Sequence, residues 1–299
     1  MLIGIDIGGT FLRIGLYDDK LVRFDKYPVK DILLSDDFIV DMSVFLKKYI
    51  TDNKADHEVI IIGFPAPIDK TRKIVLQAPN IHIGEKLNVV DKLKQELGID
   101  IFIEKDVSLL FFYDMNKYNL NNFKNICAFY FGTGIGNCIY LNGEIYIGNN
   151  GSAGELGHIP VDHSDILCGC GNVGCMENLA GGKYLARLCR ETYKDTHVSD
   201  IFTRHLEEPL IQEFIDRMAM TVASEINILD PEAVIIGGGI INMDNYPVEQ
   251  LKERIIYHTR KPLPAENLNI IITEDEEDKG VMGAIYYGLE AIKQKQGII

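Results

Sequence analysis

Positive charge is scarce in this sequence. The 299 residues include 30 Lys and Arg against 44 Asp and Glu, a formal net charge of −14. A protein that attracts nucleic acid or an anionic membrane surface needs the opposite balance. We therefore expect neither of these partners, and a neutral small molecule as the ligand.

Long apolar runs and targeting signals are also lacking. No segment approaches the roughly 18 uninterrupted apolar residues that a membrane helix needs. The chain begins at Met1 with a strand-like segment and has none of the basic, apolar and small-residue regions of a secretory signal. The expected location is cytoplasmic.

Two common nucleotide-binding motifs are missing. The P-loop pattern G-x-x-x-x-G-K-[ST] fails because Tyr184 follows Gly182-Lys183, and G-x-G-x-x-G fails because Asn137 takes the last position. Neither a P-loop NTPase nor a Rossmann dehydrogenase is supported.

Cysteine is sparse, with six residues, which is too few for a disulfide scaffold in a chain of this length. Three of the six lie close together, and one histidine lies within the same eighteen residues: His158, Cys168, Cys170 and Cys175. Glycines between them allow the loop to fold back, so this donor set suits a closed, tetrahedral and therefore structural zinc site. Free thiols in a glycine-rich loop are the alternative. The other three are expected as small buried hydrophobes: Cys127, Cys138 and Cys189.

The order of expected elements repeats along the chain. In the first half we expect strands and helices in the order listed here: strands 2–8, 11–17 and 21–29, a helix from a Ser35 cap to about 49, a strand 59–63, a helix 89–97 capped by Asn88, and a strand 101–104. The same order follows in the second half: strands 126–131 and 135–141 joined to a hairpin at Asn142-Gly143, then helices, a strand 233–236 and further helices.

This repetition predicts an α/β protein of two similar lobes with a ligand cleft between them. We place the smaller lobe at residues 1–115, with a C-terminal helix at about 281–299 packing back on it. The larger lobe, with the zinc loop, spans 116–280. The acidic run 274–278 is expected to be a solvated loop.

Glycine turns stand at matching points of the two halves. Asp6-Ile7-Gly8-Gly9-Thr10 follows the first strand, and Gly132-Thr133-Gly134 follows its counterpart. Backbone N–H groups and threonine hydroxyls in such turns can face a phosphate chain. Either turn alone could be a plain hairpin, but their recurrence favours a phosphate site. A third run, Gly237-Gly238-Gly239, leaves room for a nucleobase and ribose, although an ordinary strand-to-loop turn would explain it equally well.

A carboxylate stands where a strand gives way to a helix, in Glu104-Lys105-Asp106. A hydroxyl becomes a better phosphoryl acceptor when a carboxylate orients it and takes its proton. A helix cap is the alternative interpretation of Asp106.

These motifs in this order, with Gly154-Glu155-Leu156-Gly157-His158 leading to the cysteine cluster, resemble the ROK family (repressors, open reading frames and kinases) over essentially the whole chain. The resemblance implies an actin-like, duplicated ribonuclease-H-like fold, a zinc-braced loop, phosphorylation of a sugar by ATP with Mg²⁺, and a homodimer. Asp106 would be the catalytic base. The other residues would divide into a sugar set (Asn80, Lys105, Asp106, Glu155, His158 and Glu177), a phosphate set (Asp6, Gly8, Gly9, Thr10, Gly132, Thr133 and Gly134) and an adenosine set (Gly238 and Gly239).

Two positions depart from the family pattern, and the first of them removes a presumed sugar contact. Lys105 stands where an Asn is usual, and Phe11 stands where many members have Lys. Three short stretches are most similar to D-allose kinases within the family: 63–66, 105–107 and 260–264. The expected acceptor is therefore the 6-hydroxyl of D-allose, with glucokinase, fructokinase and N-acylmannosamine kinase as alternatives.

A non-catalytic sugar-sensing regulator is the alternative from another class. Repressors of the family carry a winged helix-turn-helix ahead of the sugar domain, and Asp6 stands almost at the first residue here, which favours a kinase.

Overall fold

The computed structural model describes residues 1–53, 59–78, 81, 83, 85–161 and 164–295, and the chain forms two compact units. Unit 1 comprises Met1–Asn121, Ile147–Ala153 and the chain from Glu276 onwards. Unit 2 comprises Asn122–Tyr146 and Gly154–Asp275. The first unit thus extends beyond residue 115, and it includes a short segment that the sequence had placed in the larger lobe.

Unit 1 is built on a five-stranded sheet with the order β3-β2-β1-β4-β7. Its strands are β1 (Leu2–Ile7), β2 (Phe11–Asp18), β3 (Lys20–Pro28), β4 (Val59–Phe64) and β7 (Asp100–Lys105). The first three form an antiparallel meander, and β4 and β7 run parallel to β1. All six residues of β4 are buried, as expected for a parallel strand covered on both faces.

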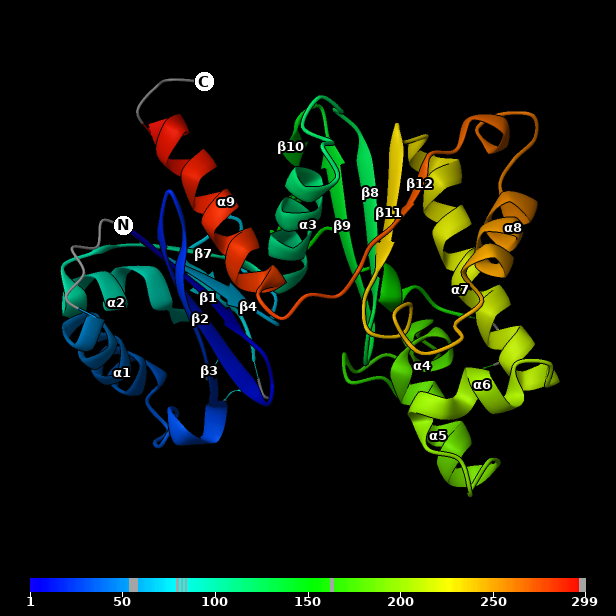
Figure 1. Cartoon of the computed structure of the whole chain (residues 1–299), viewed down its shortest axis with the longest axis horizontal. Helices are drawn as coiled ribbons and strands as arrows, with labels where there is room; N and C mark the ends of the chain where they lie inside the picture. The colour runs from blue at the N-terminus through cyan, green and yellow to red at the C-terminus, as the bar shows by residue number, and fades with distance from the viewer. Residues whose placement is uncertain (54–58, 79–80, 82, 84, 162–163, 296–299) are drawn as a thin grey trace. The chain divides into compact units, whose positions relative to one another are not determined.

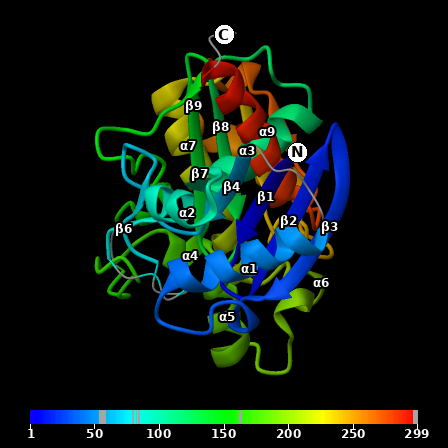
Figure 2. The same cartoon turned by 90° about the vertical axis from the view of Figure 1, so that its left-hand side faces the viewer.

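Helices cover both faces of this sheet (Figures 1 and 2). Side chains of α1 (Phe38–Asn53) and α2 (Val89–Leu97) share one core with β1 and β2, whereas α3 (Asp106–Lys117) and α9 (Lys279–Lys295) pack against the opposite face. A short turn of 3-10 helix, η1 (Val29–Asp31), and a small hairpin of β5 (Ile74–Val75) and β6 (Leu87–Asn88) complete the unit.

The helix starts show why one expected boundary was right and another wrong. Asn88 caps α2, accepting a hydrogen bond from Asp91 N at 3.1 Å, as predicted. The helix α1 begins at Phe38, and its cap is Asp37, whose Oδ1 accepts from Ile39 N at 3.0 Å. Ser35 accepts from the backbone of Asp37 instead, so it shapes the turn before the helix.

Unit 2 repeats the arrangement of unit 1, with the strand order β10-β9-β8-β11-β12. Its strands are β8 (Ile126–Phe131), β9 (Ile135–Leu141), β10 (Glu144–Ile145), β11 (Ala233–Gly237) and β12 (Ile270–Ile272). Asn142 and Gly143 both have positive φ (57° and 87°), which suits the tight β9-β10 hairpin predicted from the sequence. The first three strands are antiparallel and the last two run parallel to β8, so the topology is duplicated strand for strand.

One helical layer packs on the unit 2 sheet. The helical segments are η3 (Leu156–His158), α4 (Glu177–Ala180), α5 (Gly182–Glu191), η4 (Val198–Asp200), α6 (Ile201–His205), α7 (Pro209–Leu229), α8 (Val248–His258) and η5 (Ala265–Asn267). Phe129 and Phe131 of β8 are fully buried among apolar side chains of α4 to α8. This core belongs to unit 2 alone.

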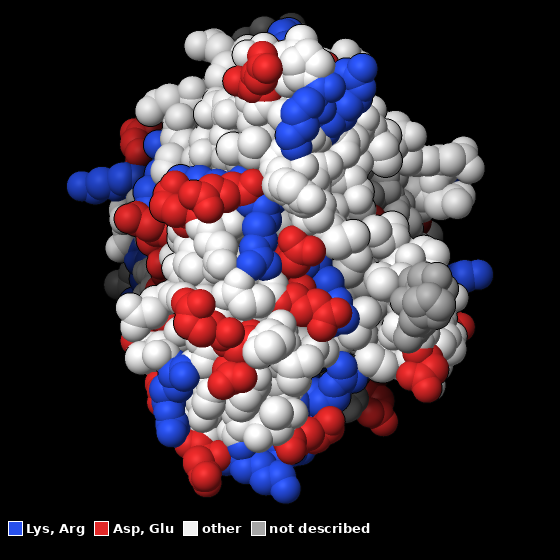
Figure 3. Space-filling model, turned by 90° about the vertical axis from the view of Figure 1, so that its right-hand side faces the viewer, with Lys and Arg blue, Asp and Glu red and all other residues white. Residues whose placement is uncertain are grey.

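Charges of both signs are interspersed on the face of unit 2 shown in Figure 3. Some charges of unit 2 pair within single helices, as Arg217 does with Glu213 on α7 and Lys252 with Glu249 on α8. Of the helices in the described residues, none combines the length and the apolar character that crossing a membrane would require.

Candidate active site

The predicted site residues of unit 1 that the structure describes lie at one edge of its sheet. Because β1, β4 and β7 are parallel, the Gly8-Gly9-Thr10 turn after β1 and Asp106 after β7 both lie at the carboxyl ends of the strands. In α/β sheets this edge is where ligands bind.

The Gly8-Gly9-Thr10 turn is tight and open to solvent. Gly8 N donates to Phe11 O at 2.9 Å, which closes the turn. Gly9 and Thr10 are exposed, and a Cβ added to Gly9 would have no atom within 4 Å. The turn can therefore receive a phosphate without side-chain obstruction.

Asp6, just before this turn, is held by two neighbours. Its Oδ2 lies 3.2 Å from Arg13 Nη1, and a Cβ on Gly280 of α9 would clash with its carboxyl group. Burial raises the pKa of Asp6 although Arg13 acts to lower it. A carboxylate at this place is suited to a Mg²⁺ ion bound with phosphates.

Asp106 is the first residue of α3, and β7 ends at the residue before it. Its Oδ1 accepts from Val107 N at 2.8 Å, and its side chain is half-buried. A carboxylate at a helix N-terminus is favoured in its charged form, which is the form a general base needs.

Glu104 and Lys105, the last two residues of β7, directly precede Asp106. Lys105 is buried, and its Nζ donates to Ala153 O at 3.2 Å, which anchors the segment 147–153. Glu104 is 2% exposed and lies 3.0 Å from Arg72 Nε through its Oε2. Burial raises the pKa of Glu104, and Arg72 opposes that shift. Asn80, which was predicted to bind the sugar, lies outside the described residues.

The second glycine turn, Gly132-Thr133-Gly134, connects β8 and β9 and is enclosed by the chain that follows the cysteine loop. Gly182 N donates to Gly132 O at 2.8 Å, and Lys183 N donates to Thr133 O at 3.1 Å. A Cβ on Gly134 would clash with the carboxylate of Glu177. Glu177 therefore lies directly against this turn.

The third glycine run joins the same edge of unit 2. Gly238 has a φ of 98°, and a Cβ there would lie 2.6 Å from Phe131 O, so both conformation and space require glycine. Ile240 N donates to Phe131 O at 2.9 Å. Gly239, in contrast, has no atom within 4 Å of an added Cβ. The glycine run therefore lies beside the end of β8, where the second turn begins, and Gly239 is the position in it with free space around a Cβ.

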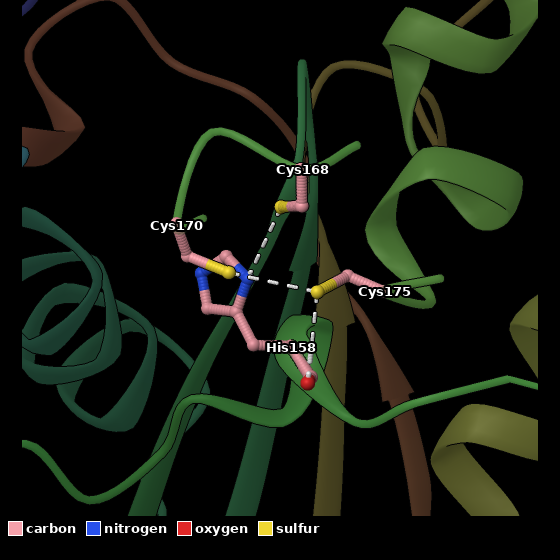
Figure 4. A group of neighbouring side chains, drawn as sticks. All are labelled: His158, Cys168, Cys170 and Cys175. Carbon is pink, nitrogen blue, oxygen red and sulfur yellow. Dashed lines mark hydrogen bonds between the residues drawn. The ribbon is translucent and has the colours of Figure 1, made fainter. Parts of the chain in front are cut away.

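The four predicted metal ligands converge (Figure 4). Their donor atoms all lie within 4.8 Å of one another. Cys168 Sγ is 3.6 Å from His158 Nδ1, and Cys170 Sγ is 3.6 Å from Cys175 Sγ. Zinc bound at about 2.1 Å to nitrogen and about 2.3 Å to sulfur in a tetrahedron separates its ligands by about 3.6–3.8 Å, so the donor set fits zinc.

The sugar-binding residues predicted for unit 2 border this cluster. His158 turns Nδ1 towards Cys168, and its Nε2 lies 3.7 Å from Glu155 Oε2. Cys168 Sγ donates to Glu177 Oε1 at 3.2 Å. A metal on Nδ1 would fix the tautomer and leave Nε2 as a defined donor beside Glu155.

The remaining cysteines, Cys127, Cys138 and Cys189, are buried as predicted, and Cys127 contacts a buried carboxyl group. Burial raises the pKa of Glu225 on α7, which accepts hydrogen bonds from Asn137 Nδ2 at 3.0 Å and from the Cys127 thiol. Asn137 O in turn lies against Gly154, whose φ is 79°. This buried group supports the start of the loop that carries Glu155 and His158.

The sequence alone did not identify several residues that contact the predicted site residues. Arg72 is far from Glu104 in the sequence, so no local pattern identifies it, whereas Arg13 lies seven residues from Asp6 across the β1-β2 turn and could have been found from the strand pairing. Gly181-Gly182 could have been found, because this pair directly follows the segment of Glu177 and both glycines pack against the second turn.

Curated relatives match nearly the whole chain. A glucokinase of Thermotoga maritima is 28% identical over 95% of this chain and 95% of its own length. An N-acetyl-D-glucosamine kinase of Photobacterium profundum is 26% identical over 97% of this chain and 100% of its own.

A solved structure shares the fold. The ROK family glucokinase from Streptomyces griseus, in complex with glucose and AMPPNP, superposes with a TM-score of 0.75 over 95% of this chain and 97% of its own, at 22% identity. With the duplicated strand order, this confirms the predicted actin-like, duplicated ribonuclease-H-like fold. A family model described as "ROK family" matches residues 2–290. The chain belongs to the ROK family.

Proposed function

We propose that this protein is an ATP-dependent hexose kinase, which transfers the γ-phosphoryl group of Mg-ATP to a hydroxyl of a free sugar. The observation that carries the proposal is the position of Asp106 on the same sheet edge as the Gly8-Gly9-Thr10 turn. Relatives that are named kinases of glucose and of N-acetyl-D-glucosamine support it.

The chemistry assigned to these residues is simple. Asp106 accepts the proton of the sugar hydroxyl as that oxygen bonds to the γ-phosphorus, while the bond from that phosphorus to the bridging oxygen breaks and ADP leaves. The two glycine turns would hold the phosphates, and Asp6 would help to hold a Mg²⁺ ion, which would neutralise part of the phosphate charge. Gly238 and Gly239 lie by the adenosine.

Sugar selection is assigned to Glu155, His158, Glu177, Lys105 and Asp106. Zinc held by His158 and the cysteines would brace the loop that presents Glu155, and it takes no part in the chemistry because its four ligands leave no open position.

The proposed acceptor is the 6-hydroxyl of D-allose. The resemblance of residues 63–66, 105–107 and 260–264 to D-allose kinases supports this choice, and the named relatives make glucose and N-acetyl-D-glucosamine the main rivals. Epimers differ in one ring hydroxyl, and a polar group left unpaired by the wrong epimer costs about 1–3 kcal/mol.

A coupled ADP-release assay over free hexoses tests both levels of the proposal. We expect a higher kcat/KM for D-allose than for D-glucose, N-acetyl-D-glucosamine, N-acetylmannosamine or D-fructose, and a 6-phosphate as product. A tenfold preference for a rival would overturn the choice of sugar but leave the kinase intact. Sugar binding without ADP release for any hexose would instead favour the regulator. The cytoplasmic location and the homodimer remain predictions.

A further inference from the structure

Unit 1 has a cavity of about 420 Å³ that is lined by residues of α1, of the edge strand β3 and of the segment that connects them. Small-molecule sites in proteins have volumes of roughly 300–1,000 Å³. The outer strands of the sheet are β3 and β7, and Asp106 follows β7, so the cavity and the proposed general base lie at opposite sides of the sheet. None of the predicted site residues that the structure describes lines the cavity.

One face of α1 forms a wall of this cavity. The lining residues of the helix recur at intervals of three and four: Asp41, Val44, Phe45, Lys48, Tyr49 and Asp52. Residues at this spacing lie on one face of an α-helix. Val44 is 63% exposed, and Leu34, which lines the cavity from the segment before α1, is 76% exposed. The cavity therefore offers apolar side chains that solvent reaches and a ligand can cover.

Three aromatic rings line the cavity and meet at an angle. The ring centroids of Tyr27 and Phe45 are 5.3 Å apart with 77° between the ring planes, and those of Phe45 and Tyr49 are 6.0 Å apart with 31°. The face of an aromatic ring carries partial negative charge and attracts a cation. Of the Lys and Arg side chains that the structure describes, none lies over these three rings.

The charged residues of the lining are mostly acidic. Asp31, Asp41 and Asp52 supply three carboxylates against the single ammonium of Lys48. The hydroxyl of Tyr49 donates to Asp25 Oδ2 at 2.8 Å, so its ring is the part of this side chain left for a ligand. An acidic lining attracts cations and disfavours phosphate-bearing ligands such as ATP.

We propose that this cavity is a binding site for a small organic cation of the quaternary ammonium class. Tyr27, Phe45 and Tyr49 contact the cationic head, and the carboxylates of Asp31 and Asp52 balance its charge. A quaternary ammonium has no N–H group to satisfy, so aromatic walls suit it, whereas Mg²⁺ needs a shell of oxygen ligands. The site is separate from those of the sugar and the nucleotide, and it does not depend on the proposed kinase function.

The test compares choline with its uncharged isostere, in which a tert-butyl group replaces the trimethylammonium group. Both are titrated into the full-length protein and followed by calorimetry or by chemical shifts. We expect saturable binding of about one choline per chain, at least about tenfold tighter than binding of the isostere, a ratio that corresponds to about 1.4 kcal/mol. Saturating D-glucose or AMPPNP should leave the choline affinity within about twofold.

Variants separate the rings from the carboxylates. Phe45→Leu removes one ring but keeps an apolar side chain, so it should weaken choline binding about tenfold and leave the isostere within about twofold. Tyr27→Phe keeps its ring and should retain choline binding. Asp52→Asn should weaken choline binding about threefold or more. Asp36→Asn changes an exposed carboxylate that does not line the cavity, and as the matched control it should bind choline like the wild type.

Equal affinities for choline and the isostere would overturn the proposal, because the cavity would then select apolar bulk and not charge. Absence of saturable choline binding would overturn it outright, and displacement of choline by AMPPNP would place the cation in the active site instead. If Phe45→Leu does not fold, Asp31→Asn and Asp52→Asn, at exposed positions, carry the comparison. Wild-type choline affinity in both of these variants would then refute the site.

Discussion

A single residue, Asp106, is the proposed general base for the sugar hydroxyl. It begins α3, where the helix N-terminus favours its charged form, and a proton can be transferred to it only while one oxygen remains basic. We expect Asp106→Asn to lower turnover by about 100-fold or more and to leave sugar binding within a few-fold, because the amide still accepts a hydrogen bond. Turnover and sugar affinity would be measured on the same preparations.

Asp100, at the start of the same strand that leads to Asp106, provides the control. Its side chain is 39% exposed and paired with Lys94. Asp100→Asn should keep wild-type turnover. A normal turnover in Asp106→Asn would remove that residue from the mechanism.

Glu225 gives a pH-dependent prediction. Burial raises its pKa in the folded protein, so the folded state binds the proton more tightly than the unfolded state does. The contribution of Glu225 to stability is fully present below its pKa in the unfolded chain, near 4.5. It is lost as the pH rises through the higher pKa of Glu225 in the folded protein. Glu225→Gln is neutral at every pH and escapes this loss.

Denaturant unfolding at pH 5 and pH 8 measures the effect. The free energy of unfolding of Glu225→Gln minus that of the wild type should be larger at pH 8 than at pH 5, because only the wild type loses this stability. Taking the difference between the two proteins removes the titration of all other groups. A difference that does not change with pH would show that Glu225 ionises as it does in the unfolded chain.

At the scale of elements, the start of α9 positions Asp6. A Cβ on Gly280 would lie 2.6 Å from Asp6 Cγ, whereas a Cβ on Gly288 of the same helix would meet the flexible end of Ile61. We expect Gly280→Ala to displace Asp6 and to lower turnover at least tenfold, the size of about 1.4 kcal/mol in the barrier. Gly288→Ala should lower the melting temperature and leave turnover nearly unchanged. Equal effects of both variants on turnover would refute a specific role of Gly280.

The cysteine loop is the second element with a testable role. Elemental analysis should find about one zinc per chain. Cys170→Ser should abolish zinc binding and weaken sugar binding, because His158 loses its fixed orientation, while far-UV circular dichroism and ATP binding persist. Cys189→Ala, outside the cluster, should retain both the metal and the sugar. Full sugar affinity in metal-free Cys170→Ser would show that zinc does not brace the site.

Local signals were sufficient for elements whose ends are set by one residue or one turn. Asn88 caps α2 as expected, Asn142-Gly143 makes the hairpin, and β8 spans the predicted residues. The segment 147–153 belongs to unit 1 because Lys105 and Arg72 donate to its carbonyls at Ala153 and Gly151. Such contacts join residues far apart in the sequence, so no local pattern could reveal them.

The acidic run is a loop with Glu274, Asp275 and Glu277 exposed, as expected. What the sequence did not predict are the partners within it, because Glu276 pairs with Lys117 of α3 and Glu277 pairs with Lys26 of β3. Just beyond the run, Lys279 and Asp114 form a buried ion pair with an N–O distance of 2.8 Å. Sequence shows the excess of one sign, but only the fold shows where the opposite charges lie.

At the scale of the whole molecule, the last prediction concerns α9, the C-terminal helix, which belongs to unit 1 together with the first 121 residues. Three apolar side chains of α9 are fully buried among those that the structure describes: Val281, Ala284 and Ile285. The latter two pack with Leu2, Val59, Ile61 and Leu109, so the face of the sheet that α9 covers would be exposed without it. Each fully buried Val or Ile contributes about 1.5–3 kcal/mol, and an entire domain is stable by only about 5–15 kcal/mol.

A chain that ends at Asp278 should therefore lose the folded state of unit 1, as seen in a weaker circular dichroism signal and a lost denaturation transition. Unit 2 has its own core, so such a chain should still hold about one zinc. A chain that ends at Lys295 is the control and should unfold like the full-length protein; an unchanged denaturation profile in the shorter chain would mean that the first 121 residues fold without α9.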